Sequence, residues 1–341
     1  MGEKLTAMRS QSLVFSGDIG GTKIRLGLWT VGESGLELVR DWTAPSLDFS
    51  GPIEALGSVC ADAELRGLSA CFGVAGPVKR ARSHLTNLPW VVDSNVLENE
   101  FGFHQVTVIN DLEATAWAIP VLDSSGLSHI KEGEADPRGT LAVLAAGTGL
   151  GQAALVRMGE GSVVCSGEGG HADFAPRTPE ELDIFRFLAE KYGHVSWERL
   201  LSGPGLVDLA EYFFSRSGDS IGDWFESLGN PEDRAAAVAT EALKAGSPSP
   251  CSLALELFVA LLGAQAGNVA LGLGATGGVV LAGGIPPKIL PALQEGVFTE
   301  RFLDKGRMRS FLERIPVSVI LDQDAPLLGA ATRAVALMKR G

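Results

Sequence analysis

Cysteine is scarce in this chain, and its spacing excludes two common uses of the residue. The 341 residues contain four cysteines, and no C-x-x-C pair occurs. This pattern excludes the usual zinc motifs and the disulfide frameworks of small secreted proteins. Each cysteine lies beside apolar residues, so we expect buried free thiols at Cys60, Cys71, Cys165 and Cys251.

Positive charge is scarce too, which limits the class of partner. Lysine and arginine number 28 against 41 acidic residues, for a formal net charge of −13. Such a chain lacks the positive field that attracts nucleic acid. The densest basic run, KRARSH at 79–84, is typical of a solvent-exposed strand or turn. We therefore expect a small-molecule ligand and no nucleic acid.

Targeting and membrane segments are not evident in the sequence. The N-terminal MGEKLTAMRSQS is polar and does not resemble a signal peptide. The longest apolar stretch, 252–285, contains Glu256, Gln265 and Asn268. A buried helix followed by a buried strand explains it better than a membrane span. These features predict a cytoplasmic protein that does not bind a membrane.

Aromatic residues supply only 7% of the chain, whereas glycine occurs 43 times and clusters in turns. The first cluster, GDIGGTK at 17–23, has neither the Gly-Lys-Ser/Thr ending of a P-loop nor the G-x-G-x-x-G spacing of a dinucleotide site. The others are AAGTGLG at 145–151 and LAGGI at 281–285. Each cluster follows an apolar run of strand length, which predicts sites built from backbone at strand ends.

The first turn has the groups that a nucleotide phosphate requires. Gly20 and Gly21 are expected to reach positive φ and to point backbone N–H groups at an anion. Asp18 lies at the strand end, where it can hold Mg²⁺ through water. Thr22 can donate to a phosphate oxygen. The alternative is a plain hairpin whose glycines serve only the turn.

The order of patterns predicts two α/β domains, since 341 residues exceed one hydrophobic core. Residues 12–18 and 23–31 form a hairpin pattern around the first glycine turn, and 140–151 with 152–159 repeat that plan. Helical patterns dominate 178–275. This mixture predicts two lobes around a cleft, with a helical insertion in the second lobe. Further strands are expected at 36–44, 68–76, 105–111, 278–285 and 316–324, and helices at 52–65, 93–102, 112–122 and 327–340.

Two polar residues lie where the strand at 105–111 meets the next helix. Asn110 or Asp111 can cap that helix. Ligands of α/β sheets, however, bind at the carboxyl ends of strands, where a carboxylate can accept a proton from a substrate hydroxyl. The sequence therefore leaves a capping role and a catalytic role open for these residues.

A second set of polar residues follows the second glycine turn. Glu168 and His171 have the spacing of a di-iron motif, but two glycines between them argue against the helix that motif requires. A loop that offers both groups suits a polyol better than a metal. Farther on, Ser196 is expected to cap a helix with Glu198 in its first turn, and the structural alternative for Glu198 is that it balances the helix dipole. His194 has no evident partner and is read as structural.

Taken together, these motifs resemble those of the bacterial glucokinase family, which has the hexokinase/actin-type ATPase fold. The matching stretches follow the family's order from about 17 to 330. They are GDIGGTKIRLGL, LTNLPW, VINDLEATAWAIP, AAGTGLGQAAL, GEGGHADFAP, GHVSWERLLSGPGL, GGVVLAGGI and LLGAA. The resemblance implies a two-lobed, ribonuclease H-like α/β fold with a cleft between a small and a larger domain. We expect the small domain at 1–111 plus 326–341 and the large one at 112–325.

The resemblance also implies roles for individual residues. Asp111 would be the general base on the glucose 6-hydroxyl, and the sugar ligands would be Asn110, Glu168, His171, Glu198 and Thr148. The phosphates of ATP would be held by Gly17, Asp18, Ile19, Gly20, Gly21, Thr22, Gly147 and Gly149, with Gly283 and Gly284 beside the nucleoside. Asp18 would bind Mg²⁺ through water. The family further implies a glycolytic enzyme and a homodimer.

Two departures from the family pattern leave questions open. Lys23 occupies a position where the family usually has Asn, and Asp324 and Ala325 replace a more usual Asn-Pro pair. Neither departure falls on one of the expected sugar ligands. The alternatives that remain are a kinase for another hexose or an amino sugar, and a non-catalytic ATP-binding regulator on the same fold.

Overall fold

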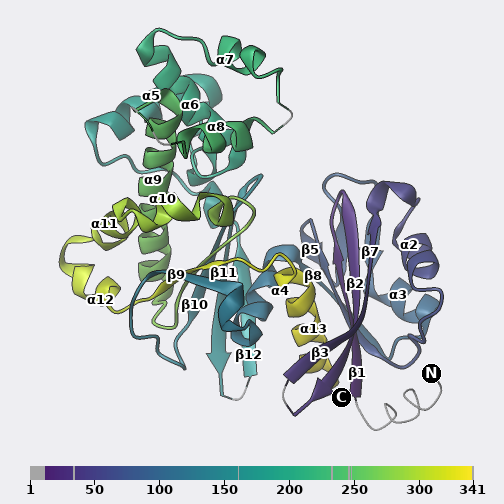
Figure 1. Cartoon of the computed structure of the whole chain (residues 1–341). Helices are drawn as coiled ribbons and strands as arrows, with labels where there is room; N and C mark the ends of the chain where they lie inside the picture. The colour runs from purple at the N-terminus through teal and green to yellow at the C-terminus, as the bar shows by residue number, and fades with distance from the viewer. Residues whose placement is uncertain are drawn as a thin grey trace. The chain divides into compact units, whose positions relative to one another are not determined.

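The computed structural model describes residues 12–33, 35–159, 161–231, 233–244, 246 and 248–339. The chain divides into two compact units (Figure 1). Unit 1 holds the residues up to Asp123 together with those from Asp322 onward, and unit 2 holds Ser124–Leu321. The domain boundaries expected after 111 and before 326 remain a prediction.

Unit 1 is built on a five-stranded mixed sheet of order β3-β2-β1-β4-β8. Strands β1, β2 and β3 are joined as an antiparallel meander, whereas β4 and β8 run parallel to β1. Their bounds are β1 (Ser12–Ile19), β2 (Lys23–Gly32), β3 (Gly35–Pro45), β4 (Ser69–Val74) and β8 (Gln105–Asn110). The predicted hairpin around the first glycine turn is thereby confirmed.

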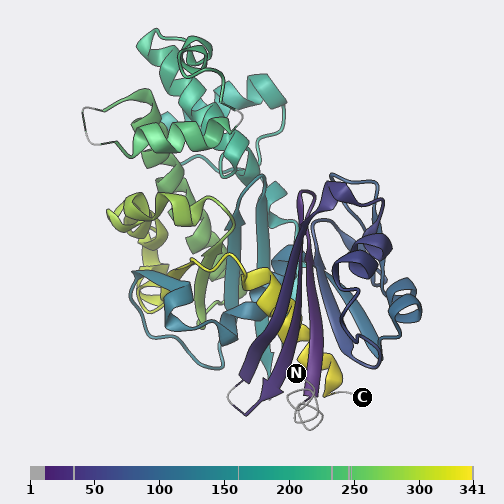
Figure 2. The same cartoon turned by 45° about the vertical axis from the view of Figure 1, so that its right-hand side comes forward.

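Helices cover both faces of this sheet (Figures 1 and 2). On one face lie α4 (Asp111–Ala118) and α13 (Ala325–Met338), and on the other α2 (Pro52–Val59) and α3 (Ser94–Phe101). Buried rings of Phe15, Phe72 and Phe103 form the core beneath α2 and α3. The expected helix at 52–65 ends early, because the chain turns after Cys60 and the Ala63 N–H bonds to the Cys60 carbonyl at 2.9 Å.

A small three-stranded sheet follows β4 in unit 1. It consists of β5 (Val78–Lys79), β6 (Arg82–His84) and β7 (Val91–Asp93). The basic run at 79–84 is thus a strand and a turn, as expected. Asp93 then caps α3 by accepting from the backbone N–H of Asn95 and Val96, and Gly102 ends that helix at φ 68°.

Unit 2 contains a six-stranded mixed sheet of order β12-β11-β10-β13-β14-β9. The bounds are β9 (Leu127–Lys131), β10 (Leu141–Ala146), β11 (Leu150–Met158), β12 (Gly161–Gly167), β13 (Gly278–Ala282) and β14 (Val317–Ile320). Antiparallel β10 and β11 repeat the hairpin plan of β1 and β2, as the sequence predicts. The two edge strands, β9 and β12, are not among the predicted strands.

The helices of unit 2 lie mostly between β12 and β13, as expected. They are α5 (Pro179–Tyr192), α6 (Gly203–Ser217), α7 (Ile221–Ser227), α8 (Arg234–Ala242), α9 (Pro250–Leu273), α10 (Leu290–Gln294), α11 (Val297–Leu303) and α12 (Arg309–Glu313). Helices α5 to α8 gather at one end of the unit, and α9 runs from them toward the sheet (Figure 1).

Helix α9 is long and apolar enough to cross a membrane, judged by length and composition alone. However, 78% of its most apolar window is buried inside the protein, as in the core helix of a globular domain. It is followed by β13, which is buried throughout. The predicted buried helix and buried strand are therefore confirmed.

The expectation of four buried thiols is wrong at one position. Cys60, Cys71 and Cys251 are buried, but Cys165 is exposed. The reason is its place on β12, an edge strand whose side chains are largely exposed.

Candidate active site

The first glycine cluster forms the tight turn between β1 and β2. The last strand pair is Ile19 with Ile24, and the Gly20 N–H donates to the Lys23 carbonyl at 3.0 Å. The expected positive φ is wrong for Gly20 and Gly21, which adopt ordinary backbone angles. What limits side chains here is space, because a Cβ on Gly20 would lie 3.1 Å from the Lys23 carbonyl oxygen.

A pocket of about 320 Å³ opens at this turn. All of its lining belongs to unit 1, namely Asp18, Gly20, Gly21, Thr22, Lys23, Arg25 and Gln323. The predicted phosphate residues 18, 20, 21 and 22 therefore line one pocket, together with Lys23. By contrast, Ile19 is fully buried in the core beside the turn. Gly17 lies against the Phe72 ring so closely that a Cβ would overlap it.

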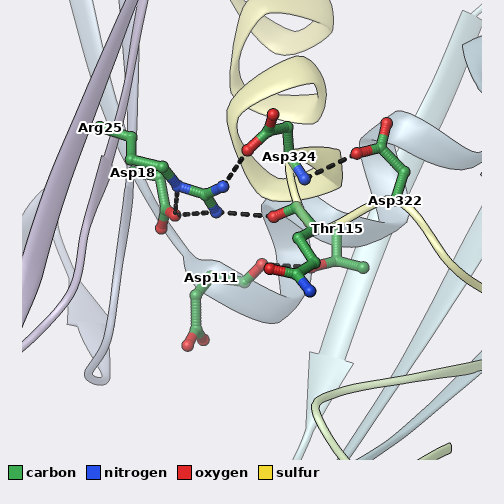
Figure 3. Close-up of polar contacts among 7 residues, drawn as sticks. Asp18, Arg25, Asp111, Thr115, Asp322 and Asp324 are labelled. Carbon is green, nitrogen blue, oxygen red and sulfur yellow. Dashed lines mark hydrogen bonds and ion pairs between the residues drawn. The ribbon is translucent and has the colours of Figure 1, made fainter. Parts of the chain in front are cut away.

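Asp18 is held by Arg25, a residue that none of the sequence motifs marks as functional. Arg25 is the cross-strand neighbour of Asp18 on β2. Its Nε and Nη2 both donate to Asp18 Oδ2, at 3.2 and 2.8 Å. The same guanidinium donates to the Asp324 carboxylate and, at 2.7 Å, to the Gln323 carbonyl (Figure 3). Arg25 thus joins the phosphate turn to the start of α13.

Burial and charge act in opposite directions on Asp18. Burial raises the pKa of this carboxyl, and the hydrogen bond and charge of Arg25 oppose the shift. The charge of Lys23 lowers the same pKa, whereas that of Asp324 raises it. Burial is the largest of these effects, so the pKa of Asp18 is raised overall, and the two cations limit the rise in favour of the ionised form that a divalent cation requires.

The pocket residues fit Mg²⁺ of the kind that substrate phosphates carry. Among the described residues, no group of three or more His, Cys, Asp or Glu side chains could hold a metal by itself. Mg²⁺ in phosphoryl-transfer sites is held by one or two carboxylates, waters and the phosphates themselves. Asp18 meets that need, since both Arg25 hydrogen bonds reach Oδ2 and Oδ1 receives none from the described residues.

Asn110 and Asp111 lie at the junction of β8 and α4, also in unit 1. The Asn110 Oδ1 accepts from the Leu112 N–H at 2.9 Å, and its Nδ2 donates to the Gly76 carbonyl at 3.2 Å. Asn110 therefore caps α4, the structural alternative considered from the sequence. Its carboxamide keeps one further donor and one further acceptor for a ligand.

Asp111 is the first residue of α4 and is mostly buried. Its Oδ1 accepts from the Leu112 N–H at 2.8 Å, and its carboxylate points away from the Arg25 guanidinium (Figure 3). Burial is the main cause that raises the pKa of Asp111, and the negative charge of Asp18 adds to the rise. Gly73 of β4 permits the close approach of α4, because a Cβ there would lie 3.0 Å from the Ala114 Cβ.

In unit 2, the second glycine cluster forms the turn between β10 and β11. The Gly147 N–H donates to the Gly149 carbonyl at 2.9 Å. Glu198 Oε2 accepts from the Leu150 N–H at 2.9 Å, just past the turn. A Cβ on Gly149 would lie 2.6 Å from that oxygen, so glycine leaves room for the carboxylate. Thr148, the remaining predicted residue of the turn, lies between these two glycines.

Three predicted sugar ligands gather beside this turn. His171 Nδ1 lies 3.6 Å from Glu198 Oε1, and His171 Nε2 lies 4.0 Å from Glu168 Oε2. The segment expected as an irregular loop is a short 3₁₀ turn, Gly169–His171, because its two glycines pack tightly on β11. The side chains of Glu168 and His171 are exposed, so a polar ligand can reach both of them.

The helix expected to begin at Ser196 is placed differently. Residues Trp197–Arg199 form one 3₁₀ turn, and Ser196 makes no capping hydrogen bond. The capping serine is Ser202, which accepts from the Gly205 N–H at 3.1 Å and begins α6. Sequence pattern could not separate the two because both serines precede helical stretches.

Two contacts explain further residues of this region. The Gly203 N–H at the start of α6 donates to the Gly147 carbonyl at 2.8 Å, which fixes the helix end against the turn. His194 does have a partner, since its Nε2 lies 2.8 Å from Asp173 Oδ1. This pair could not be predicted from sequence, because the two residues are 21 positions apart.

The third glycine cluster packs against the second. Gly283 has φ 87°, and a Cβ on it would overlap the Ala146 carbonyl oxygen at the end of β10. The same oxygen accepts from the Ile285 N–H at 3.2 Å. Close packing therefore explains Gly283, whereas a Cβ on Gly284 would meet no atom within 4 Å. A role beside a nucleoside stays a prediction for both.

Comparison with known proteins identifies the family of the chain. A family model described as glucokinase matches residues 15–337. The glucokinase of Synechocystis sp. is 38% identical over 94% of this chain and 97% of its own. A glucokinase from an Antarctic psychrotroph has a crystal structure with TM-score 0.83 at 34% identity, covering 95% of this chain and 99% of that one.

A more distant structure shows the fold alone. The ROK family glucokinase from Streptomyces griseus, in complex with glucose and AMPPNP, has TM-score 0.61 at 20% identity, covering 97% of this chain and 100% of that one. The predicted fold class, family and glucose-phosphorylating activity are confirmed by the closer matches. With its family model matched over 15–337, this chain belongs to the glucokinase family.

Proposed function

We propose that the chain transfers the γ-phosphoryl group of ATP, bound with Mg²⁺, to the 6-hydroxyl of D-glucose. The observation that carries the proposal is Asp111, a carboxylate at a strand end whose pKa is raised by burial. A raised pKa strengthens a carboxylate as a proton acceptor. Asp111 is the proposed general base, which orients the 6-hydroxyl and accepts its proton.

The sugar would be bound by groups that pair with its other hydroxyls. The proposed ligands are Asn110, Glu168, His171, Glu198 and Thr148. Support comes from His171, which lies between two of the carboxylates: its Nδ1 is 3.6 Å from Glu198 Oε1 and its Nε2 is 4.0 Å from Glu168 Oε2. A site that pairs with hydroxyls rejects analogues that lack them, because its own polar groups would stay unpaired.

The nucleotide would be bound mainly by backbone groups. The proposed phosphate residues are Gly17, Asp18, Ile19, Gly20, Gly21, Thr22, Gly147 and Gly149, with Gly283 and Gly284 beside the nucleoside. Mg²⁺ near Asp18 would neutralise charge on the phosphates. In phosphoryl transfer, the protein mainly aligns the reactants and stabilises charge, and it performs little covalent chemistry. An acidic chain can therefore do this chemistry.

The finer assignments belong to the same proposal. We expect a cytoplasmic homodimer that acts in glycolysis and binds neither nucleic acid nor membrane. The net charge of −13 supports the absence of nucleic acid as a partner.

Glucose-dependent release of ADP from the purified chain tests this function. The assay compares glucose with its epimers, with glucosamine and with no sugar, in Mg²⁺ and in EDTA. We expect glucose to exceed its epimers by about a hundredfold or more in kcat/KM. Preference for another sugar would identify a different sugar kinase. ATP binding without turnover on any sugar would identify a regulator instead.

A further inference from the structure

Outside the proposed catalytic residues, the side chain of Arg25 forms a bridge of hydrogen bonds between separate elements of unit 1. Its guanidinium contacts Asp18 on the neighbouring strand and two residues that lie 298 and 299 positions away, Gln323 and Asp324. All of these residues belong to unit 1. One side chain therefore connects β1, β2 and the start of α13 (Figure 3).

The bridge has an inner half, the pair of Arg25 with Asp18, and an outer half, the pair of Arg25 with Asp324. The two halves differ in exposure to solvent. The side chains of Arg25 and Asp18 are 15% and 18% exposed, whereas that of Asp324 is 68% exposed. An exposed ion pair contributes little to stability because water competes for both charges. The outer half is therefore better explained by orientation: Asp324 and the Gln323 carbonyl keep the guanidinium in one position while it holds Asp18.

The inner half leaves Asp18 with one oxygen free. Arg25 donates twice to Oδ2, so a planar guanidinium fixes the plane of the carboxylate. No hydrogen bond from the described residues reaches Oδ1, and Asp18 lines the pocket with Gly20, Gly21 and Thr22. The free oxygen therefore belongs to a carboxylate of fixed orientation at the proposed phosphate turn.

The anchor of Arg25 is itself well fixed. The Asp324 N–H donates to Asp322 Oδ1 at 2.7 Å, which shapes the turn before α13. Helix α13 packs on α4 so closely that a Cβ on Gly329 would overlap the Ala114 carbonyl oxygen. Helix α4 begins at Asp111. The bridge thus ends on the helix that supports the proposed base.

We propose that Arg25 is a positioning residue for the divalent cation of the nucleotide, and that Asp324 is its anchor. Arg25 acts through Asp18, which it holds with Oδ1 available to the hydration shell of Mg²⁺. Asp324 stands where the family pattern usually has Asn, so in this chain the anchor is a carboxylate, which accepts hydrogen bonds only. The inference rests on the proposed function, since it takes the pocket at the turn as the nucleotide site.

Calorimetric titration of AMPPNP, with Mg²⁺ and separately in EDTA, tests the proposal on Arg25→Met, Arg25→Lys and Asp324→Ala. We expect Arg25→Met to lose about tenfold or more of the affinity for Mg·AMPPNP, the scale of a lost charge-assisted contact. Metal-free AMPPNP and glucose should bind as in the parent chain. Arg25→Lys should recover part of the loss, because lysine keeps the positive charge but cannot reproduce the paired hydrogen bonds of the planar guanidinium.

Two comparisons separate positioning from a general structural role. Adding Asp18→Asn to Arg25→Met should cost little more than Asp18→Asn alone, because both changes remove the same oriented carboxylate. Arg40 lies on the next strand, β3, where it makes an exposed ion pair with Asp62, and Arg40→Met should leave binding unchanged. Equal weakening with and without Mg²⁺ would show that Arg25 serves only the fold.

The outcomes also separate this inference from the proposed function. If the parent chain phosphorylates glucose and Arg25→Met binds Mg·AMPPNP normally, the inference is wrong and the function stands. If the parent chain has no kinase activity but Mg·AMPPNP binding depends on Arg25, the function is wrong and the inference stands. Should Arg25→Met fail to fold, Arg25→Lys and Asp324→Ala decide, since each keeps a partner for the remaining charges.

Discussion

At the scale of single residues, Lys23 is the clearest departure from the family pattern. It lines the pocket at the first glycine turn, and its charge lowers the pKa of Asp18. It is not the lysine of a P-loop, because it begins a strand rather than a helix. Its exposed position instead allows a long-range attraction for phosphate charge.

Replacing Lys23 by Asn, the usual family residue, should therefore weaken ATP binding modestly. We expect the KM for ATP to rise about two- to fivefold at low salt, the range of one exposed charge. The difference should shrink as ionic strength increases. Steady-state kinetics at several salt concentrations measures it, with Lys79→Asn on β5 as the control. An unchanged KM at low salt would show that Lys23 does not reach the nucleotide.

Asp111 gives a prediction in which activity and stability change in opposite directions. Its raised pKa means that the folded state binds the proton more tightly than the unfolded state. The associated stability is present below the unfolded pKa and is lost as pH rises through the folded pKa. At neutral pH the ionised carboxylate therefore costs stability, and Asp111→Asn should melt at a higher temperature than the parent chain.

The same variant should lose about 10²- to 10⁴-fold in kcat, the usual contribution of a general base, and keep its affinity for glucose. In the parent chain, kcat/KM should fall on the acid side with a midpoint above 3.8, the ordinary value for Asp. Melting curves and pH–rate profiles check both parts. Near-normal turnover in Asp111→Asn would remove Asp111 from the mechanism.

At the scale of elements, the contact between α4 and α13 determines where Asp111 lies. The two helices approach each other closely at Gly329, since a Cβ there would overlap the Ala114 carbonyl oxygen. Both helices cover the same face of the sheet in unit 1 (Figure 2). A change that separates them would move the first turn of α4 relative to β8.

Gly329→Ala should therefore destabilise unit 1 and reduce turnover together. Overpacking typically costs about 1–3 kcal/mol, and the shift of α4 adds a kinetic defect. Gly272→Ala on α9 is the matched control, because a Cβ there would meet no atom within 4 Å. That control should be neutral or slightly stabilising. Chemical denaturation and the ADP assay measure the two effects, and equal stability of both variants would contradict the packing argument.

The helices and strands also show which parts of the fold could be predicted from the sequence. Both glycine hairpins, the buried α9 and the strand of 105–111 followed by α4 were predictable, because each has a local pattern of apolar residues and turn residues. The edge strands β9 and β12 were not, since their side chains are half exposed and lack a strong apolar period. The positive φ expected at Gly20 and Gly21 was wrong because steric room, not backbone angle, limits those positions.

At the scale of the whole molecule, the predicted sugar ligands come from both units. Asn110 and Asp111 belong to unit 1, and Glu168, His171 and Glu198 to unit 2. Sequence order alone could not group them; the resemblance to a family did so. The Arg25–Asp324 contact could not be predicted from the sequence, because it joins residues 299 positions apart and depends on where α13 lies.

Glucose should make the molecule more compact if ligands from both units act on one sugar. Closure of a lobed enzyme excludes water from the reacting phosphate. Small-angle scattering with and without saturating glucose measures the radius of gyration, and galactose provides the control. An identical radius with glucose, in a chain that binds glucose by calorimetry, would contradict closure.

The late position of α13 has a consequence for synthesis of the chain. The ribosome makes β1 long before α13, yet the helix covers the face of the sheet to which β1 belongs. Until residues 324–338 leave the ribosome, that apolar face has α4 but lacks α13, and Arg25 lacks its partner Asp324. A chain truncated before residue 325 would thus contain the strands of unit 1 without the helix that packs on them.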